Sequence, residues 1–488
     1  MQINQLVKLL EKEQLLRQIV NIDPHSSQEI SDLTFDSRAV TDATVFFVKG
    51  QNFRTEFLLQ ALTQGAILVV SENRYDLVDC PQLLVSDIRR AMALAAREFF
   101  NYAYKAFKLI GITGTKGKTT TSYYIKNVLD EYLSYSSALI STIEVDTGKR
   151  KEEAHLTTPE AIELHRLFRE VADCGLGFLT MEVTSQAYKT QRAYGIEFDT
   201  GLFLNIAEDH ISPEEHEDFA DYLQCKLEFI RNCRQVVINY ETACFPEVRQ
   251  AAENAEVIIT YGSAANKGAV DYYVDNIAKV GDFWHFTVYG LDYQLNLQTK
   301  IAGRFNIENA LAAIVTCRLY GIDDACIQRG IAKTEVSGRM NVFEKAGITV
   351  IVDYAHNQLS FTKLYESLEL DYPGSKIITV AGGPGGKAYN RRRELGEIAG
   401  SYCQFMYLTA EDPQFEAATA ICQEIATYLS IPYEIIIDRK QAIETAISKA
   451  QPGDVVVILG KGEEQYQKVK GEFVAYESDL EIARELMK

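Results

Sequence analysis

Glycine, lysine and hydroxyl side chains are combined in one short segment in a way that can bind phosphate. The segment lies between an apolar run at 108–113 and a stretch with helical patterning from Thr119 onward. Glycines let backbone N–H groups approach an anion, and a helix N-terminus adds favourable partial charge. The segment therefore predicts a nucleotide-binding phosphate loop, with a plain glycine turn as the alternative. Its residues are Gly114, Thr115, Lys116, Gly117, Lys118, Thr119 and Thr120.

Three side chains can supply the chemistry that a nucleoside triphosphate needs at such a loop. We expect Lys118 to reach the β- and γ-phosphates and Thr119 to place its hydroxyl on Mg²⁺. Glu182 lies at the end of a second apolar run, 178–183. Because an open parallel sheet presents its ligand crevice at the ends of its strands, we expect Glu182 to bind Mg²⁺ as well.

Apolar runs of strand length recur along the chain and alternate with helical patterns, which predicts parallel sheets covered on both faces. The segment 270–301 alternates more strictly and predicts antiparallel strands added to the first sheet. The further apolar runs are 202–206, 236–239, 257–260, 349–353, 377–381, 405–409 and 455–459.

The fold class that follows is α/β with three domains, as a chain of 488 residues suggests. We expect a small α/β domain at 1–104, a central phosphate-loop domain with a parallel sheet at 105–337, and a Rossmann-like domain at 338–488. Ser337 and Gly338 are expected to form the hinge between the last two.

Composition excludes several classes of protein. The formal net charge is −19, so general nucleic-acid binding is not expected, because phosphate contacts need a basic surface. No apolar run reaches the roughly 18 residues of a membrane span, and the first twenty residues show no secretory pattern. The nine cysteines include no Cys-x-x-Cys pair and are expected to be free thiols. We expect a monomer in the cytoplasm.

The phosphate loop departs from the common spacing, because Ile112 stands where the first glycine is expected and Gly114 follows two residues later. In this form it resembles the loop of the Mur ligase family, which builds the peptide of bacterial cell-wall precursors. Five further segments resemble motifs of that family, in the expected order along nearly the whole chain. They are 181–185 (Met-Glu-Val-Thr-Ser), 205–210 (Asn-Ile-Ala-Glu-Asp-His), 303–310 (Gly-Arg-Phe-Asn-Ile-Glu-Asn-Ala), 337–340 (Ser-Gly-Arg-Met) and 353–357 (Asp-Tyr-Ala-His-Asn).

The resemblance implies an ATP-dependent amide ligase that converts a carboxylate into an acyl phosphate, which an amine then attacks. It implies that His210 and Lys226 hold a second Mg²⁺, with Lys226 modified to a carbamate by CO₂. It also implies that Arg339 reaches the γ-phosphate when the domains close. The catalytic set is then Lys118, Glu182, His210, Lys226 and Arg339, and the further nucleotide contacts are Asn306, Asn309, Asp353 and His356.

Each of the less obvious residues has a plainer alternative. Imidazole is an unusual ligand for magnesium, so His210 can instead be a capping or core histidine. Lys226 lies in an amphipathic helical segment and can be an ordinary solvated lysine. Arg339 can form a salt bridge at the hinge.

The amino-terminal segments 34–40 and 45–50 resemble the uridine-diphosphate-binding domain of Mur ligases. Leu-Thr-Thr-Pro-Glu at 156–160 resembles a segment of those members that extend UDP-N-acetylmuramoyl-L-alanyl-D-glutamate. An ordinary turn between two strands is the alternative at 34–40. The residues implied for this substrate are Ser37, Thr157, Thr158, Thr184 and Arg192.

The carboxy-terminal domain is implied to select the incoming amino acid through Glu411, Asp412, Pro413 and Gln414. Family members that use meso-diaminopimelate carry Asp-Asn-Pro-Arg there, and Gln414 cannot pair with a carboxylate as that arginine does. The acidic pair suits an ammonium group, and Glu464 can add a further anion, so L-lysine is the expected substrate. A solvated turn before the proline is the alternative.

Other possibilities stay open. The added amino acid can be meso-diaminopimelate or ornithine, and the group that binds its α-carboxylate can be Lys387 or one of the arginines at 391–393. A non-ligase ATP-binding paralogue and a folylpolyglutamate synthetase are further alternatives. The latter lacks the Asp-Ser-Arg unit that stands at 36–38.

Overall fold

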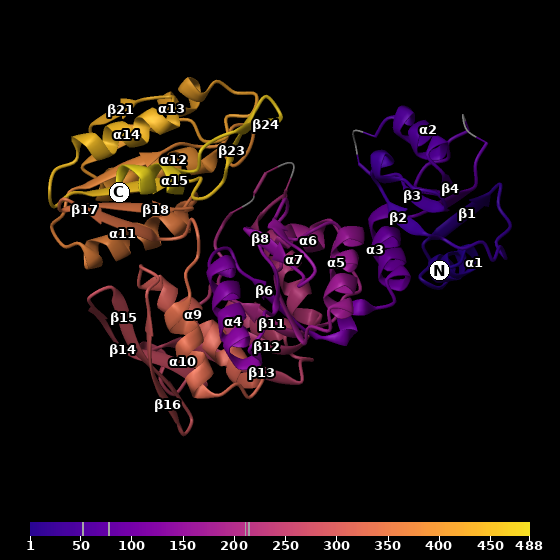
Figure 1. Cartoon of the computed structure of the whole chain (residues 1–488), viewed down its shortest axis with the longest axis horizontal. Coiled ribbons are helices and arrows are strands. Elements are labelled where there is room, and N and C mark those ends of the chain that lie inside the picture. The colour runs from indigo at the N-terminus through magenta and orange to yellow at the C-terminus, as the bar shows by residue number, and fades with distance from the viewer. Residues whose placement is uncertain (51–52, 77–78, 210, 213–214) are drawn as a thin grey trace.

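The protein consists of three α/β units that follow one another along the chain, seen in a computed structural model (Figure 1). This three-unit α/β fold confirms the predicted fold class, while the domain limits stay predictions. The structure describes residues 1–50, 53–76, 79–209, 211–212 and 215–488.

The amino-terminal unit is a five-stranded sheet with strand order β1-β5-β4-β3-β2, in which only β1 runs antiparallel to its neighbour among the described residues. Its last helix, α3, is rich in alanine on the face that packs toward the sheet and begins at Asp87, whose carboxylate caps two backbone N–H groups. The elements are α1 (Ile3–Lys12), β1 (Leu16–Val20), β2 (Asp32–Thr34), β3 (Thr44–Phe47), α2 (Thr55–Thr63), β4 (Ala66–Ser71), β5 (Gln82–Val85) and α3 (Ile88–Phe99).

The central unit is built on an 11-stranded sheet of order β16-β15-β14-β13-β12-β11-β6-β10-β7-β8-β9. Strand β6 lies between β10 and β11 and is parallel to both, so the segments that follow these three strands meet at one edge. Strands β14–β16 pair antiparallel, as the alternation at 270–301 predicted.

The strands of the central unit are β6 (Lys108–Thr113), β7 (Ala138–Ile140), β8 (Glu144–Asp146), β9 (Lys151–Glu153), β10 (Phe178–Glu182), β11 (Phe198–Phe203), β12 (Cys233–Asn239), β13 (Val257–Ser263), β14 (Tyr272–Val280), β15 (Phe283–Gly290) and β16 (Tyr293–Thr299). Its helices are α4 (Lys118–Leu133), α5 (Ala161–Asp173), α6 (Ser185–Lys189), α7 (Phe219–Arg231), α8 (Phe245–Ala251), α9 (Phe305–Leu319) and α10 (Asp324–Lys333).

The carboxy-terminal unit has a six-stranded sheet of order β17-β18-β22-β19-β20-β21, parallel except at β17, and a separate hairpin, β23–β24. Its strands are β17 (Asn341–Lys345), β18 (Ile348–Asp353), β19 (Ile377–Ala381), β20 (Phe405–Leu408), β21 (Tyr433–Ile435), β22 (Val455–Leu459), β23 (Tyr466–Val469) and β24 (Glu472–Ala475). Its helices are α11 (Gln358–Asp371), α12 (Asn390–Tyr402), α13 (Ala418–Ala426), α14 (Arg439–Lys449) and α15 (Asp479–Leu486).

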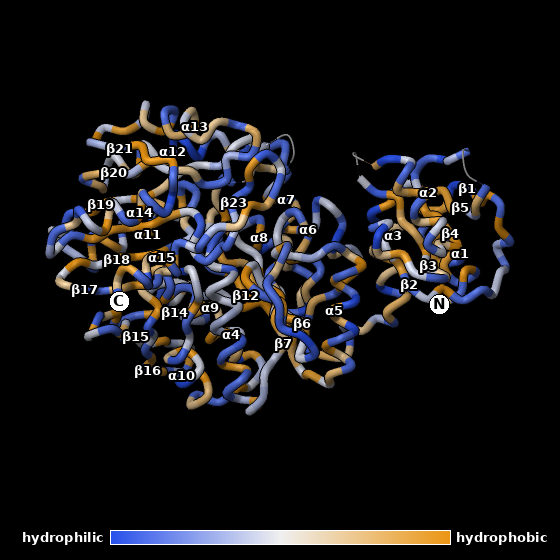
Figure 2. Tube along the Cα trace, turned by 45° about the horizontal axis from the view of Figure 1, so that its top comes forward, coloured by the Kyte–Doolittle hydropathy of each residue, from blue (hydrophilic) through white to orange (hydrophobic). Residues whose placement is uncertain are grey.

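Each sheet carries a hydrophobic core on its faces, and the hydrophobic segments in Figure 2 run along the interior strands. The central sheet has two such cores, because helices cover both of its faces. Over the described residues, no helix has the length and apolar character needed to cross a bilayer. All nine cysteines are free thiols, as expected.

Helix α10 packs so closely on α4 that the contact leaves no room for a side chain at Gly330. A Cβ added there would lie 2.5 Å from the Cα of Val128. Backbone cannot yield as the end of a side chain does, so this contact fixes the spacing of the two helices behind the phosphate loop.

We predict that Gly330→Ala lowers the free energy of unfolding by about 1–3 kcal/mol, because overpacking forces the two helices apart. Chemical denaturation measures this change. Gly177→Ala is the matched control, since the nearest atom to its added Cβ is 3.7 Å away. Equal stabilities of the two variants would contradict the prediction.

Candidate active site

The phosphate loop is held in place by the segment that follows β11. Backbone N–H groups of Thr115 and Lys116 donate to the carbonyl and side-chain oxygens of Asn205, at 3.0 and 2.8 Å. The Asn205 amide in turn donates to the carbonyl of Lys116 at 3.1 Å. The hydroxyl of Tyr222, from α7, lies 3.0 Å from that of Thr115. The loop is therefore ordered by its neighbours before any nucleotide binds.

Gly117 shows why this loop needs glycine. Its φ is +87°, in the left-handed region, and an added Cβ would lie 2.2 Å from the side-chain oxygen of Asn309. Asn309 also donates to Asn306 at 2.9 Å, and both asparagines belong to α9. These two residues, which are expected to contact the nucleotide, thus line the same cleft as the loop.

Two lysines meet at one carbonyl oxygen of the loop. Lys118 donates to Gly114 O at 2.8 Å, and Lys226 donates to the same oxygen at 3.0 Å. Lys226 is 2 % exposed, and burial together with the charge of Lys118 holds its pKa well below the usual value. The pKa of Lys118 is lowered as well, chiefly by burial. Lys226 is therefore not the solvated lysine that its helical segment alone would suggest.

Glu182, 1 % exposed, lies at the centre of a cluster of oxygen atoms. The hydroxyl of Thr119 donates to one carboxylate oxygen at 2.9 Å. Thr142 donates to both carboxylate oxygens, through its N–H at 2.8 Å and its hydroxyl at 3.1 Å. No lysine or arginine among the described residues forms an ion pair with this carboxylate. An anion surrounded by neutral hydroxyl groups fits a hard divalent cation, which prefers oxygen ligands.

The residues implied for the nucleotide-linked substrate continue from this cluster. Thr157 lies 3.0 Å, hydroxyl to hydroxyl, from Thr142. Thr158 donates to the carbonyl of Glu182 at 3.0 Å and lies 3.3 Å from the hydroxyl of Thr184. Thr157 and Thr184 line the cleft. The run of hydroxyl groups leads from Glu182 toward the amino-terminal unit.

Three predicted residues lie away from this cleft or beyond description. Arg192 does not line it, but donates to the carbonyl of Thr158 at 3.0 Å and pairs with Glu160 at 3.1 Å. Ser37 is buried in the amino-terminal unit, where its hydroxyl donates to Gln60 at 2.8 Å. His210 lies outside the described residues, so the structure gives no geometry for it.

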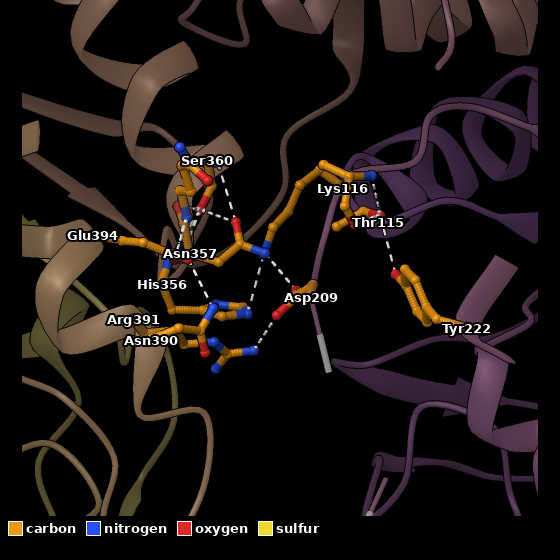
Figure 3. Close-up of polar contacts among 12 residues, drawn as sticks. Thr115, Lys116, Asp209, Tyr222, His356, Asn357, Ser360, Asn390, Arg391 and Glu394 are labelled. Atoms are coloured by element: carbon orange, nitrogen blue, oxygen red, sulfur yellow. Dashed lines mark hydrogen bonds and ion pairs between the residues drawn. The ribbon is translucent and has the colours of Figure 1, made fainter. Parts of the chain in front are cut away.

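The central and carboxy-terminal units are joined across the cleft by buried polar contacts (Figure 3). Arg391, from α12, donates to Asp209 at 2.7 Å, and both side chains are less than one-tenth exposed. The amide of Asn357 makes a short hydrogen bond to the other oxygen of Asp209. Asp209 belongs to the segment after β11, so this contact ties α11 and α12 to the phosphate loop.

A second contact in Figure 3 joins Lys116 to His356 at 3.1 Å. The Nδ1 atom of His356 donates to the carbonyl of Tyr354 at 2.7 Å, so Nε2 carries no proton and accepts from the Lys116 ammonium. Burial lowers the pKa of Lys116 to about 7 and lowers that of His356 well below its usual range. A cation of the phosphate loop is thus in contact with the third unit.

Arg339 and Asp353 complete the nucleotide side of the cleft, which both line. The guanidinium of Arg339 lies 4.2 Å from the ring centroid of Tyr354. Asp353 accepts from the N–H groups of Met340 and Ala355, so it organises the start of the third unit. Burial raises its pKa, and Arg339 opposes that shift. The guanidinium of Arg339 faces an aromatic ring and is not engaged in an ion pair with a described residue.

The amino-acid end of the cleft contains an unexpected internal ammonium group. Lys461, 1 % exposed, contacts Asp412 at 2.8 Å and makes a short contact with Glu464. Tyr354 also donates to Glu464 at 2.6 Å. Glu411 has no hydrogen bond to a described residue, and burial beside Asp412 raises its pKa to about 7. Two of the three acids predicted to receive an amine are therefore already paired with a lysine of the protein.

Pro413 and Gln414 lie beside this end of the cleft and do not line it. The carbonyl of Pro413 packs against Gly385, where an added Cβ would be 1.9 Å away. Gln414 has φ +53° and pairs through its backbone with the hairpin β23–β24. These residues shape the wall behind Glu411 and Asp412.

The cleft that joins all these groups has a volume of about 860 Å³ and lies between the central and carboxy-terminal units. Lys116, Lys118 and Arg339 line it near the phosphate loop, together with Glu182, and Glu411, Asp412 and Glu464 line its other end. Lys461 pairs with two of these last three carboxylates. Thr142, Asp209 and Lys461 belong to this machinery but did not emerge as site residues from the sequence. Thr142 follows the buried strand β7, and its place after a strand end was the signal that could have revealed it.

Comparisons with known proteins agree with this geometry. Two family models match the chain: the Mur ligase middle domain at 112–317 and the Mur ligase glutamate ligase domain at 338–462. A UDP-N-acetylmuramoyl-L-alanyl-D-glutamate–L-lysine ligase from Streptococcus pyogenes is 39 % identical over 491 residues, which cover 99 % of this chain and 98 % of that protein.

Solved structures share the whole fold. A UDP-N-acetylmuramoyl-L-alanyl-D-glutamate–2,6-diaminopimelate ligase has a TM-score of 0.64 at 23 % identity, covering 95 % of this chain and 96 % of that one. The MurF ligase of Thermotoga maritima, in complex with ADP, has a TM-score of 0.60 at 20 % identity, and the match covers 88 % of this chain and 93 % of that one.

We predict that Arg391→Met opens the cleft, because it removes the buried ion pair that joins α12 to Asp209 of the central unit. Removing one partner of a buried ion pair costs about 3–5 kcal/mol, which separation of the units can relieve by hydration. Solution X-ray scattering should show a larger radius of gyration. Arg393→Met is the control, since Arg393 is 62 % exposed on the same helix. If the radius of gyration is the same in Arg391→Met, Arg393→Met and the parent protein, Arg391 does not hold the cleft closed.

Proposed function

The chain belongs to the Mur ligase family, and from this premise we propose that it adds L-lysine to UDP-N-acetylmuramoyl-L-alanyl-D-glutamate. It is an ATP-dependent, ADP-forming amide ligase of peptidoglycan precursor synthesis. The observation that supports the lysine assignment is the carboxyl group of Glu411, which lines the end of the cleft away from the phosphate loop and forms no ion pair with a described residue.

The phosphate end suits the first half of the reaction, in which the γ-phosphoryl group passes to the D-glutamate carboxylate. Such transfer depends mainly on positioning and charge stabilisation. We propose that Lys118 turns from the Gly114 carbonyl to the β- and γ-phosphates, and that Arg339 supports the transferred group. Thr157 and Thr184 would hold the acceptor near Glu182 through their hydroxyl groups.

We propose that Thr119 and Glu182 hold Mg²⁺, and that His210 and a carbamate of Lys226 hold a second ion. Bound there, Mg²⁺ would neutralise charge on the phosphates. The surroundings of Lys226 support carbamate formation, since burial favours the neutral amine that reacts with CO₂. The modified side chain would carry a negative charge beside Lys118, which relieves the repulsion between the two ammonium groups.

The carboxylate end suits the second half, in which an amine attacks the acyl phosphate through a tetrahedral intermediate and releases phosphate. We propose that Glu411 receives the ε-ammonium of lysine, and Asp412 and Glu464 line the same end of the cleft. Gln414 supplies no cation for the second carboxylate of diaminopimelate. We further propose that the enzyme works as a monomer in the cytoplasm, and light scattering of the ligand-bound protein tests the oligomeric state.

The contacts of the candidate cations favour one of them as the group that binds the α-carboxylate of the added amino acid. Arg392 is 3 % exposed and paired with Glu416 and Glu424, and Arg393 points to solvent. Arg391 is paired with Asp209. Lys387 lines the cleft without an ion pair to a described residue, so we propose it for this role.

We predict that ADP release with UDP-N-acetylmuramoyl-L-alanyl-D-glutamate depends on lysine and is at least 100-fold slower with diaminopimelate. Lys118→Met should lower kcat by 100-fold or more, because an interaction with transferring phosphate is lost. A coupled ADP assay with a panel of diamino acids measures both. Turnover independent of any amino acid would favour a non-ligase paralogue, and preference for ornithine or diaminopimelate would overturn the lysine assignment.

We predict that the KM for lysine falls as pH rises from 6 to 8. The pKa of Glu411 is raised to about 7 by burial, so the carboxyl is largely protonated at pH 6 and becomes the anion that binds ammonium at pH 8. The KM of Glu411→Gln should be higher and nearly constant over this range. If the KM of Glu411→Gln falls between pH 6 and 8 as much as that of the parent protein, Glu411 does not receive the amine.

A further inference from the structure

A group of metal-ligating side chains lies at the start of α7, outside the catalytic cleft. His216 precedes the helix, and Asp221 and Cys225 are four residues apart within it, so they project from the same face. A ring nitrogen of His216, a carboxylate oxygen of Asp221 and the sulfur of Cys225 all lie within 4.8 Å of one another. Among the described residues, this is the one group of three such side chains that could hold a metal ion.

The group is separate from the magnesium sites proposed above. None of its three members lines the catalytic cleft. Lys226 directly follows Cys225, and its ammonium contacts the phosphate loop. Because successive residues of a helix project about 100° apart, the cleft and this group lie on different sides of α7.

His216 is held in the orientation that a metal ligand needs. Its side chain is fully buried, with Nε2 at 2.9 Å from the hydroxyl of Ser185 and Nδ1 at 2.8 Å from Asp221. The ring of Tyr222 packs edge-on against the imidazole, with the centroids 5.2 Å apart. A metal-binding histidine usually donates its second N–H to a neighbouring polar group, and Ser185 is placed to accept it. Nδ1, which faces Asp221, is then the atom that binds the metal.

The chemistry of the three donors favours zinc over magnesium. Mg²⁺ prefers oxygen ligands, whereas a thiolate together with an imidazole suits Zn²⁺ and similar transition-metal ions. Zinc bonds of about 2.0–2.3 Å place tetrahedral ligands about 3.3–3.6 Å apart. The separations in the structure span this range, from 2.8 Å between His216 Nδ1 and Asp221 to at most 4.8 Å within the group.

One cation of the protein competes for this position. The ammonium of Lys189, at the end of α6, lies 2.9 Å from the same oxygen of Asp221 that faces His216. The side chains of Lys189 and Asp221 are 33 % and 26 % exposed, so their ion pair is close to solvent. Such a pair contributes at most about 1 kcal/mol, which a divalent ion with three ligands can exceed.

We propose that His216, Asp221 and Cys225 form a binding site for a zinc-class divalent ion, with solvent in the fourth position. The ion binds Nδ1, a carboxylate oxygen and the thiolate, and the thiol proton passes to solvent. Its binding replaces the ion pair by which Lys189 links α6 to α7. The proposal goes beyond the ligase assignment and does not depend on it, because no nucleotide or amino acid takes part.

Titration of the full-length protein with Co²⁺, a spectroscopic substitute for Zn²⁺, tests the site, with excess Mg²⁺ present to occupy oxygen-rich sites. Binding should produce the visible absorption of a tetrahedral ion and a near-ultraviolet band from thiolate bound to Co²⁺. Added Zn²⁺ should remove both. Cys225→Ser should abolish the near-ultraviolet band, and Ser185→Ala should raise the Kd about tenfold, because the imidazole loses its orienting partner.

Cys244→Ser is the matched control, because Cys244 is also half-buried and lies at another helix. Its spectrum and Kd should equal those of the parent protein. A thiolate band that survives in Cys225→Ser, or that is missing from the parent protein at saturating Co²⁺, would overturn the proposal.

Lys189→Met gives a test that a thiol binding metal elsewhere would not pass. Removal of the competing ammonium should lower the Kd for Co²⁺ about tenfold, because Asp221 no longer exchanges one cation for another. A Kd that is unchanged or higher in this variant would contradict binding at Asp221. Far-ultraviolet circular dichroism shows that each variant is folded.

Discussion

The crowding of positive charge at the phosphate loop is the constraint on which the rest of the structure depends. Lys116, Lys118 and Lys226 lie close together in a cleft that excludes much of the solvent, and burial lowers the pKa of each. Repulsion between such groups is tolerated only where backbone carbonyls and partner side chains accept hydrogen bonds from them. The carbonyl of Gly114 accepts from both Lys118 and Lys226. The same repulsion favours binding of a polyanion such as a triphosphate in the cleft.

The carboxy-terminal unit contacts this region through one neutral group and one cation. His356 meets Lys116 as a neutral acceptor, and Arg391 pairs with Asp209 of the central unit, which lies near the phosphate loop. Closure of the two units is thus coupled to the electrostatics of the nucleotide site, because the contacts that close the cleft involve residues next to the phosphate loop. Under the proposed function, the same closure would bring an amino acid held at the Glu411 end toward the acyl group.

Much of the fold followed from the sequence, because its buried strands are long apolar runs. Strand β9, by contrast, is Lys-Glu-Glu and exposed, and the hairpin β23–β24 is largely solvent-facing, so neither has an apolar signal. In the site, Thr119 of the phosphate loop lies in contact with Glu182, as the prediction from the ends of two parallel strands requires. The pairing of Lys461 with Asp412 joins residues 49 positions apart, and no local pattern encodes such a contact.

The ammonium of Lys461 has a thermodynamic consequence for substrate choice. Lys461 already compensates Asp412 and Glu464, so an incoming amine that docks at this end of the cleft has Glu411 as its remaining anionic partner. Attraction from the other two carboxylates is therefore weak. Discrimination among amines of different chain length then depends on the fit of their methylene groups between Glu411 and the cleft wall at Pro384 and Ala388, where steric complementarity and water release decide the outcome.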